Sequence, residues 1–257
     1  MLRKGDLTQG GITGTLLHFT LPMMVGSFLQ QCYNIADTLI VGQCIGAGAL
    51  AAVGSAYTLM VFLISVLLGL AMGSGTVFSL HYGAGNHVAL RRSIFSSFVL
   101  IGIVTLILNV AVFIWLDPIL RLLQVPQDIY GMMRSYLWII FCGIVVTFIY
   151  NFYASLLRAV GDSVTPLWFL AVSVVLNIAL DLFFILQLDW GIQGAAAATV
   201  LAQGVAALGI IIYTYRRRPE LRWHHEDMCF DRTCLKEIAS FSTLTCVQQS
   251  VMNLGIL

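Results

Sequence analysis

Six apolar segments, each long enough to cross a lipid bilayer, constrain this chain more than any other feature. A helix needs about 20 consecutive apolar residues to cross a hydrocarbon core of about 30 Å. The segments are continuous rather than alternating, which favours helices over a β-barrel. The sequence therefore predicts an all-α membrane protein with a six-transmembrane-helix bundle plus the start of a seventh helix. The segments cover residues 16–41, 53–80, 94–116, 136–156, 167–188 and 192–215.

The composition supports a membrane protein, because 59% of the residues are hydrophobic and only 10% are charged. A net charge of +1 gives no reason to expect a nucleic-acid partner. Lys and Arg are more frequent in cytoplasmic loops, and eleven of the thirteen fall on one predicted side. We therefore expect a multi-pass protein of the cell membrane with a cytoplasmic amino terminus. Arg121 and Arg134 are the two exceptions.

The chain divides at a polar, basic stretch. Residues 1–215 are predicted to form the amino-terminal bundle, 216–234 a cytoplasmic loop, and 235–257 the start of a second bundle. Gln248 and Gln249 repeat Gln30 and Gln31 at an offset of 218 residues, a spacing that suits a second copy of the bundle. The sequence suggests a truncated protein that lacks the carboxy-terminal bundle; a short complete protein with a re-entrant tail is the alternative.

Two carboxylates lie inside apolar segments, Asp37 in the first and Asp181 in the fifth. An ionisable group at the centre of a membrane helix costs about 3 kcal/mol on insertion scales, so it is a candidate for a functional role. Polar residues near them share helical faces at spacings of three, four or seven. These residues are Gln30, Tyr33 and Asp37, flanked by Asn34, then Asn177 and Asp181, and finally Thr199 and Gln203.

The depths of these groups also agree. At 1.5 Å per residue, Asp37 lies about 7 Å from the outer end of its segment, and Asp181 and Thr199 lie about 12 Å from theirs. If the three helices are neighbours, two carboxylates, an amide and a hydroxyl form one polar cluster. Oxygen ligands of this kind suit H⁺ or Na⁺, and two adjacent carboxylates cannot both ionise cheaply. The alternative is that Asp37 reaches the outer interface and Asp181 only makes a packing hydrogen bond.

Two prolines mark local structure. Pro22 is expected to bend the first helix, and a bent helix that carries Asp37 would be a moving part. Residues 158–166, which end at Pro166, predict a helix end, a glycine turn and an N-cap at Ser163 or Thr165. The charged residues of this segment, Arg158 and Asp162, are expected to have structural roles.

No enzyme motif is present: the sequence has no phosphate loop, HExxH or GxSxG, and no lysine in a predicted span. A catalytic role, an organic cofactor and disulfides are therefore not expected. The cluster of His224, His225, Cys229 and Cys234 lacks metal-binding spacing, so a solvated loop is the simpler interpretation.

Several stretches together resemble the multidrug and toxic compound extrusion (MATE) transporters, closest to their DinF-like branch. They occur in order over residues 1–215. The stretches are ADTLIVGQCIGAGALAAVG (36–54), YGAGN (82–86), RAVGDSVTP (158–166), NIALD (177–181) and GAAAATVLAQ (194–203).

The resemblance implies two six-helix bundles around a cavity that opens to alternate sides of the membrane. It implies that Asp37, Asn177, Asp181 and Thr199 form the ion-coupling site, and that Pro22 is the helix-bending proline. The expected function is efflux of amphipathic or cationic compounds in exchange for H⁺ or Na⁺. Candidate residues of the substrate cavity are Gln30, Tyr33, Asn34, Phe148, Tyr150, Phe152, Tyr153 and Gln203. The alternatives are a lipid-linked sugar flippase of the same superfamily and a non-transporting truncated membrane module.

Overall fold

The computed structural model describes residues 12–222 and 232–254, which form eight α-helices and no β-strand. This confirms the all-helical prediction. A π-helical turn, η1 (Phe183–Gln187), follows α6, and a 3₁₀ turn, η2 (Pro219–Leu221), follows α7. The α-helices are α1 (Ile12–Cys44), α2 (Ala47–Gly83), α3 (His87–Leu122), α4 (Gln127–Cys142), α5 (Ile144–Ala159), α6 (Val164–Leu182), α7 (Gly191–Arg217) and α8 (Arg232–Leu254).

Four segments within the described residues are long and apolar enough to cross a membrane, namely α2, α3, α6 with η1, and α7. The bent pair α4 and α5 adds a fifth if it counts as one span. Helix α1 is long, but Gln30, Gln31 and Asp37 lower its mean hydropathy. Length and hydropathy therefore support several membrane-spanning helices without reproducing the predicted count of six.

The predicted continuous span 136–156 is broken at Gly143, where α4 and α5 meet at an angle of 47°. A Cβ atom at Gly143 would lie 2.4 Å from Cγ2 of Val200 on α7. Glycine therefore lets α7 approach the chain closely here, and the predicted segment 136–156 is bent where α4 and α5 meet.

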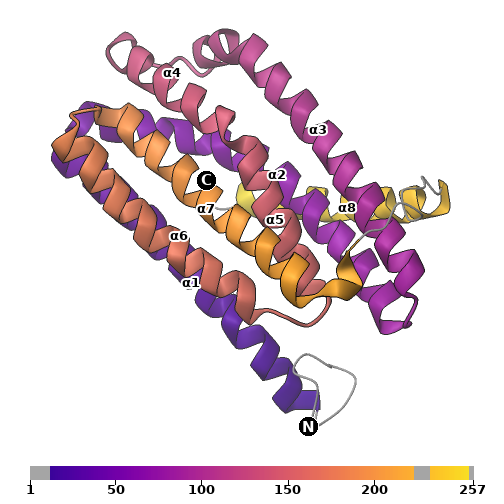
Figure 1. The fold of residues 1–257 in the computed structure, drawn as a ribbon. Helices are drawn as coiled ribbons and strands as arrows, with labels where there is room; N and C mark the ends of the chain where they lie inside the picture. Colours follow the sequence, from indigo (N-terminus) through magenta and orange to yellow (C-terminus); the bar gives the residue numbers. More distant parts are fainter. Residues whose placement is uncertain (1–11, 223–231, 255–257) are drawn as a thin grey trace.

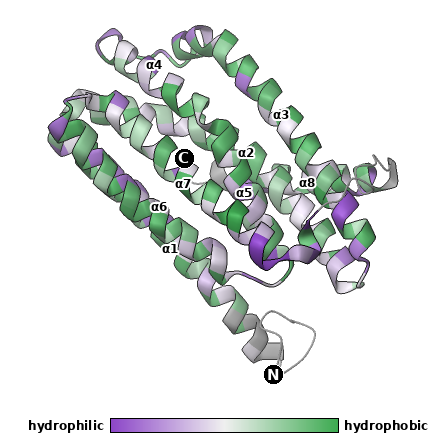
Figure 2. Ribbon diagram, viewed as in Figure 1, coloured by the Kyte–Doolittle hydropathy of each residue, from purple (hydrophilic) through white to green (hydrophobic). Residues whose placement is uncertain are grey.

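Helix α6 packs against α1 on one side and α7 on the other, and α7 also packs against α4 and α5 (Figure 1). Helix α8 lies along α2, behind it in this view. Apolar residues cover most of the helix surfaces, and hydrophilic residues gather at the helix ends, most clearly where α7 ends (Figure 2). Large apolar side chains such as Phe28 and Val175 are about 70% exposed, which suits contact with lipid.

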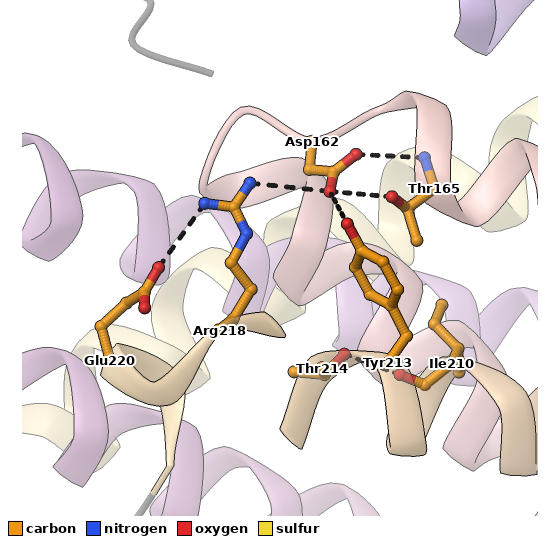
Figure 3. Close-up of polar contacts among 7 residues, drawn as sticks. All are labelled: Asp162, Thr165, Ile210, Tyr213, Thr214, Arg218 and Glu220. Carbon is orange, nitrogen blue, oxygen red and sulfur yellow. Dashed lines mark hydrogen bonds and ion pairs between the residues drawn. The ribbon is translucent and has the colours of Figure 1, made fainter. Parts of the chain in front are cut away.

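The turn between α5 and α6 is stabilised by Asp162. Its Oδ1 accepts a hydrogen bond from the backbone N–H of Thr165 at 3.0 Å, and its Oδ2 accepts one from the Thr165 hydroxyl at 2.9 Å (Figure 3). Gly161 precedes it with a φ of 87°, as the predicted glycine turn requires. The capping side chain is therefore Asp162 rather than the predicted Ser163 or Thr165, because an aspartate two residues before the helix can reach the free N–H groups.

Asp162 also connects this turn to the end of α7. Its Oδ2 accepts a hydrogen bond from the Tyr213 hydroxyl at 3.5 Å and lies 3.6 Å from Nη2 of Arg218. Arg218 in turn lies 3.5 Å from Glu220 in η2 (Figure 3). Arg158 instead donates from Nε to the carbonyl of Ala154, one turn earlier in α5. These contacts agree with the structural roles expected for Asp162 and Arg158.

Candidate functional site

Two buried carboxyl groups form the centre of the candidate site. The side chains of Asp37 on α1 and Asp181 on α6 are 8% and 0% exposed, and the two carboxyl groups lie close enough to interact electrostatically. Oδ1 of each has no hydrogen-bond partner among the described residues. Two neighbouring carboxyl groups can form a hydrogen bond with each other only if at least one of them is protonated. Two ionised carboxylates can instead share a cation.

Asn177 and Thr199 extend the site from Asp181 toward α7. Asn177 is buried one turn before Asp181, and its hydrogen bonds assign the amide nitrogen to the side facing Oδ2 of Asp181, at 2.9 Å. In this orientation the amide oxygen accepts the backbone N–H of Thr199 at 3.2 Å. The Thr199 hydroxyl lies 3.1 Å from the carbonyl of Ala195, to which it donates. The amide and the threonine therefore link α6 to α7 beside the aspartates.

Two tyrosines complete the surroundings. The hydroxyl of Tyr33, one turn before Asp37 on α1, lies 3.2 Å from the Thr199 hydroxyl. Tyr136 of α4 is 4% exposed and close enough to interact electrostatically with both aspartates. No sequence pattern pointed to Tyr136, because a tyrosine within an apolar segment most often belongs to the core.

Other residues predicted for the site lie apart from this cluster. Gln203 accepts a hydrogen bond from the Thr147 hydroxyl of α5 at 2.5 Å. Gln30 is exposed on α1, and Asn34 donates to the side chain of Gln31 at 3.2 Å. Shared helical faces therefore placed Tyr33 correctly beside the aspartates, whereas Gln203 faces α5.

The four aromatic candidates for a substrate cavity lie in or beside the apolar core. Phe148 and Phe152 are at most 4% exposed and pack against each other and Phe98. Tyr150 donates its hydroxyl to the carbonyl of Pro166 at 3.0 Å, and Tyr153 packs edge-on against Phe152. A role in a substrate cavity therefore stays a prediction for these residues.

Pro22 lies inside the continuous helix α1, ahead of the residues that approach α6 and α7. Among the described residues, no three His, Cys, Asp or Glu side chains lie close enough together to bind one metal ion. His224, His225 and Cys229, which belong to the cluster considered above, lie outside the described residues. The oxygen atoms of Asp37 and Asp181 are of the kind that small hard cations prefer as ligands.

Comparison with known proteins identifies the family, since the family model MatE matches residues 22–183, more than half of the chain. The chain belongs to the MATE family. Its relatives include the probable multidrug resistance protein YpnP of Bacillus subtilis, 36% identical over 84% of the chain and 49% of the relative. The probable multidrug resistance protein NorM of Thermotoga maritima is 28% identical over 94% of the chain and 53% of the relative.

Solved structures agree on the fold of this MATE chain. It superposes along its whole length on 57% of a multidrug resistance MATE family transporter in its outward-facing conformation, with a TM-score of 0.91 and 24% identity. A MOP superfamily transporter from Pyrococcus furiosus gives a TM-score of 0.87 and 25% identity over the same shares. The chain thus spans about half the length of the curated relatives and solved structures it matches.

Proposed function

We propose that this chain is the ion-coupling half of a MATE exporter, which expels amphipathic or cationic compounds in exchange for H⁺ or Na⁺. The observation that carries the proposal is the pair of buried, neighbouring carboxyl groups of Asp37 and Asp181. Ionisable groups inside membrane helices are costly, so such a pair is a candidate for a functional role such as ion exchange. The names of relatives, several of them multidrug export proteins, support export as the process that the ion drives.

The geometry supports a simple coupling step. With the ion bound, one proton or one Na⁺ lowers the charge of the carboxyl pair from −2 to −1 and bridges the two groups, which holds α1 against α6. Without the ion, two negative charges face each other in a low dielectric and repel, which favours an arrangement in which α1 moves away from α6. The ion thus has different affinities for the two arrangements, as coupling requires. The substrate cavity would form between this bundle and a second one.

Dye efflux tests the role of the pair. The chain, together with any coding sequence that follows it in its gene, is expressed in cells that lack other exporters. We expect Asp37→Asn to abolish ion-driven efflux while the protein still inserts at normal levels. The matched control is Asp189→Asn, the same change at an exposed residue whose φ of 53° suits asparagine. Unchanged efflux in Asp37→Asn would reject the carboxyl pair as the coupling site.

The coupling ion is then separated by two gradients. Efflux that follows an imposed pH gradient without Na⁺ indicates a shared proton. Efflux that needs Na⁺ at constant pH indicates a cation held by both carboxylates and by the hydroxyl oxygen of Thr199.

The proposal includes an orientation, with the amino terminus and the α5–α6 turn in the cytoplasm. Cys44 is exposed at the end of α1, on the predicted outer side. A membrane-impermeant maleimide should therefore label it in intact cells, and Cys44→Ser should remove that label. Labelling that appears only after the cells are permeabilised would reverse the orientation.

A further inference from the structure

A polar cavity of about 220 Å³ lies where the end of α2 meets the starts of α3 and α8. A single water needs only about 10–15 Å³ of such space, so the cavity admits a group of several heavy atoms. Its polar lining includes His81, Asn86, Arg92 and Glu237. None of the residues around the aspartate pair lies on these three helices, so the cavity is separate from the candidate ion site.

Arg92 gives the cavity a group that seeks an anion. Its Nε is enclosed and has no hydrogen-bond partner among the residues that the structure describes. An enclosed donor without an acceptor costs about 1–3 kcal/mol, more when it is charged, so a ligand that supplies an oxygen is favoured there. Guanidinium groups match phosphate in shape and charge. The start of α3, five residues before Arg92, adds the positive end of a helix dipole.

Glu237 gives the same cavity a group that seeks a cation. One of its carboxylate oxygens lies 3.8 Å from Nε2 of His81, and its side chain is about half exposed. Among the described residues, the other oxygen has no hydrogen-bond partner, so it can accept a hydrogen bond from a second donor. The cavity therefore presents one positive and one negative side chain to a single occupant, which suits a zwitterion better than a simple anion.

The surroundings of the cavity indicate where such an occupant would come from. Leu80, next to His81, is 57% exposed, and Val88, on the cavity wall, is 48% exposed. These apolar side chains stand beside charged groups at the ends of membrane-spanning helices. Charged side chains next to exposed apolar ones mark the depth of the lipid headgroups, where acyl chains begin.

We propose that this cavity binds the phosphoethanolamine headgroup of a membrane phospholipid, with its phosphate on Arg92 and its ammonium on Glu237. The acyl chains would then lie along Leu80 and Val88. An ammonium group donates hydrogen bonds to the carboxylate, whereas the trimethylated choline headgroup has no such donor and a glycerol headgroup has no positive charge. Because Glu237 belongs to α8 and Arg92 to α3, the lipid would join the start of α8 to the first bundle.

Native mass spectrometry of the purified chain tests this site directly. The protein is incubated in detergent with phosphatidylethanolamine, phosphatidylcholine or phosphatidylglycerol of identical acyl chains, and bound lipid is counted. We expect phosphatidylethanolamine to bind about tenfold more tightly than the others, the effect of one lost charged hydrogen bond. Equal binding of the three lipids would overturn the proposal, as would displacement of the lipid by millimolar inorganic phosphate, which would indicate a free-phosphate site.

Two variants separate the two halves of the headgroup. Glu237→Gln should remove the preference for phosphatidylethanolamine and leave phosphatidylglycerol binding unchanged. Arg92→Gln should weaken binding of all three lipids about tenfold, and Arg121→Gln, the same change at a residue far along α3, should not. Because Glu237 is half exposed, its substitution leaves the fold intact and keeps the test valid even if Arg92→Gln is unstable. A preference that survives Glu237→Gln would contradict the proposal.

Discussion

Helices α1 and α8 both pack against the rest of the bundle, but through different kinds of contact. On α1, a Cβ at Gly26 would meet the nearest atom, Cδ1 of Leu167, at an ordinary 3.6 Å. On α2, a Cβ at Gly73 would lie 2.4 Å from Cα of Ser242, and one at Gly69 would lie 2.5 Å from Cα of Cys246. Helix α8 therefore lies backbone to backbone on α2, whereas α1 meets α6 through side chains.

The difference shows which interface can respond to an ion. Close packing of small residues leaves one fit between α2 and α8, and no charged side chain takes part in the close approach at Gly69 and Gly73. The contact of α1 with α6 and α7 instead depends on Asp37, Asp181 and the hydroxyl pair of Tyr33 and Thr199. Under the proposed function, the stability of this interface would depend on whether a proton or cation is bound, as a moving interface requires.

The largest effect is expected from Gly73→Ala, which disrupts the close contact between α2 and α8. One added methyl group must displace the backbone of α8, so we expect the free energy of unfolding to fall by about 3 kcal/mol. The control is Gly54→Ala on the same helix, where a Cβ meets nothing within 4 Å. That variant should be neutral or up to about 1 kcal/mol more stable, because alanine favours the helix. Denaturant unfolding of the purified chain measures both; equal stability would show that α8 is not held by this contact.

At the other interface, Asp181→Asn should have the opposite effect on stability. It removes a buried carboxyl oxygen that lacks a partner and keeps an oxygen to accept the hydrogen bond from Asn177. We expect the free energy of unfolding to rise by about 1 kcal/mol while ion binding is lost. Unfolding curves with and without Na⁺ at several pH values provide the measurement. A large loss of stability would mean that the pair serves the fold.

Thr199→Val should produce a smaller change, which tests the role of the Thr199 hydroxyl where α1 meets α7. It removes the hydroxyl that Tyr33 and Ala195 contact, so we expect a loss of about 1 kcal/mol in stability and about fivefold in ion affinity. Thr199→Ser keeps the hydroxyl and should restore the affinity. If serine and valine behave alike, the hydroxyl does not take part in binding the ion.

Sequence patterns predicted which polar residues would lie near Asp181, because these patterns report local geometry. A spacing of four residues places Asn177 beside Asp181 on any helix, and counting residues from the helix ends placed Thr199 at a matching depth. The same reasoning missed Tyr136, which reaches the site only because α4 packs there. It also missed the contact of Gly69 and Gly73 with α8, since the partner lies more than 160 residues away in the sequence.

Long-range contacts likewise decided the remaining differences. Gly143 breaks the α4–α5 span because Val200 of α7 occupies the space beside it, and no local pattern shows that. Phe148 and Phe152 pack against Phe98 in an aromatic core. An apolar cavity wall would have the same composition, so the sequence alone does not distinguish the two. The composition predicts that these residues are buried, and only the three-dimensional packing shows which residues they contact.

The π-helical turn η1 has a consequence for how this helix tolerates changes in length. A π-turn closes hydrogen bonds between residues five apart, as the contact from the Leu188 N–H to the Phe183 carbonyl does at 3.3 Å. Removing one residue from it restores an α-helical turn and leaves everything before Leu182 in place. We therefore expect homologues to differ by single-residue insertions or deletions between Leu182 and Asp189, with Asp181 in an unchanged register.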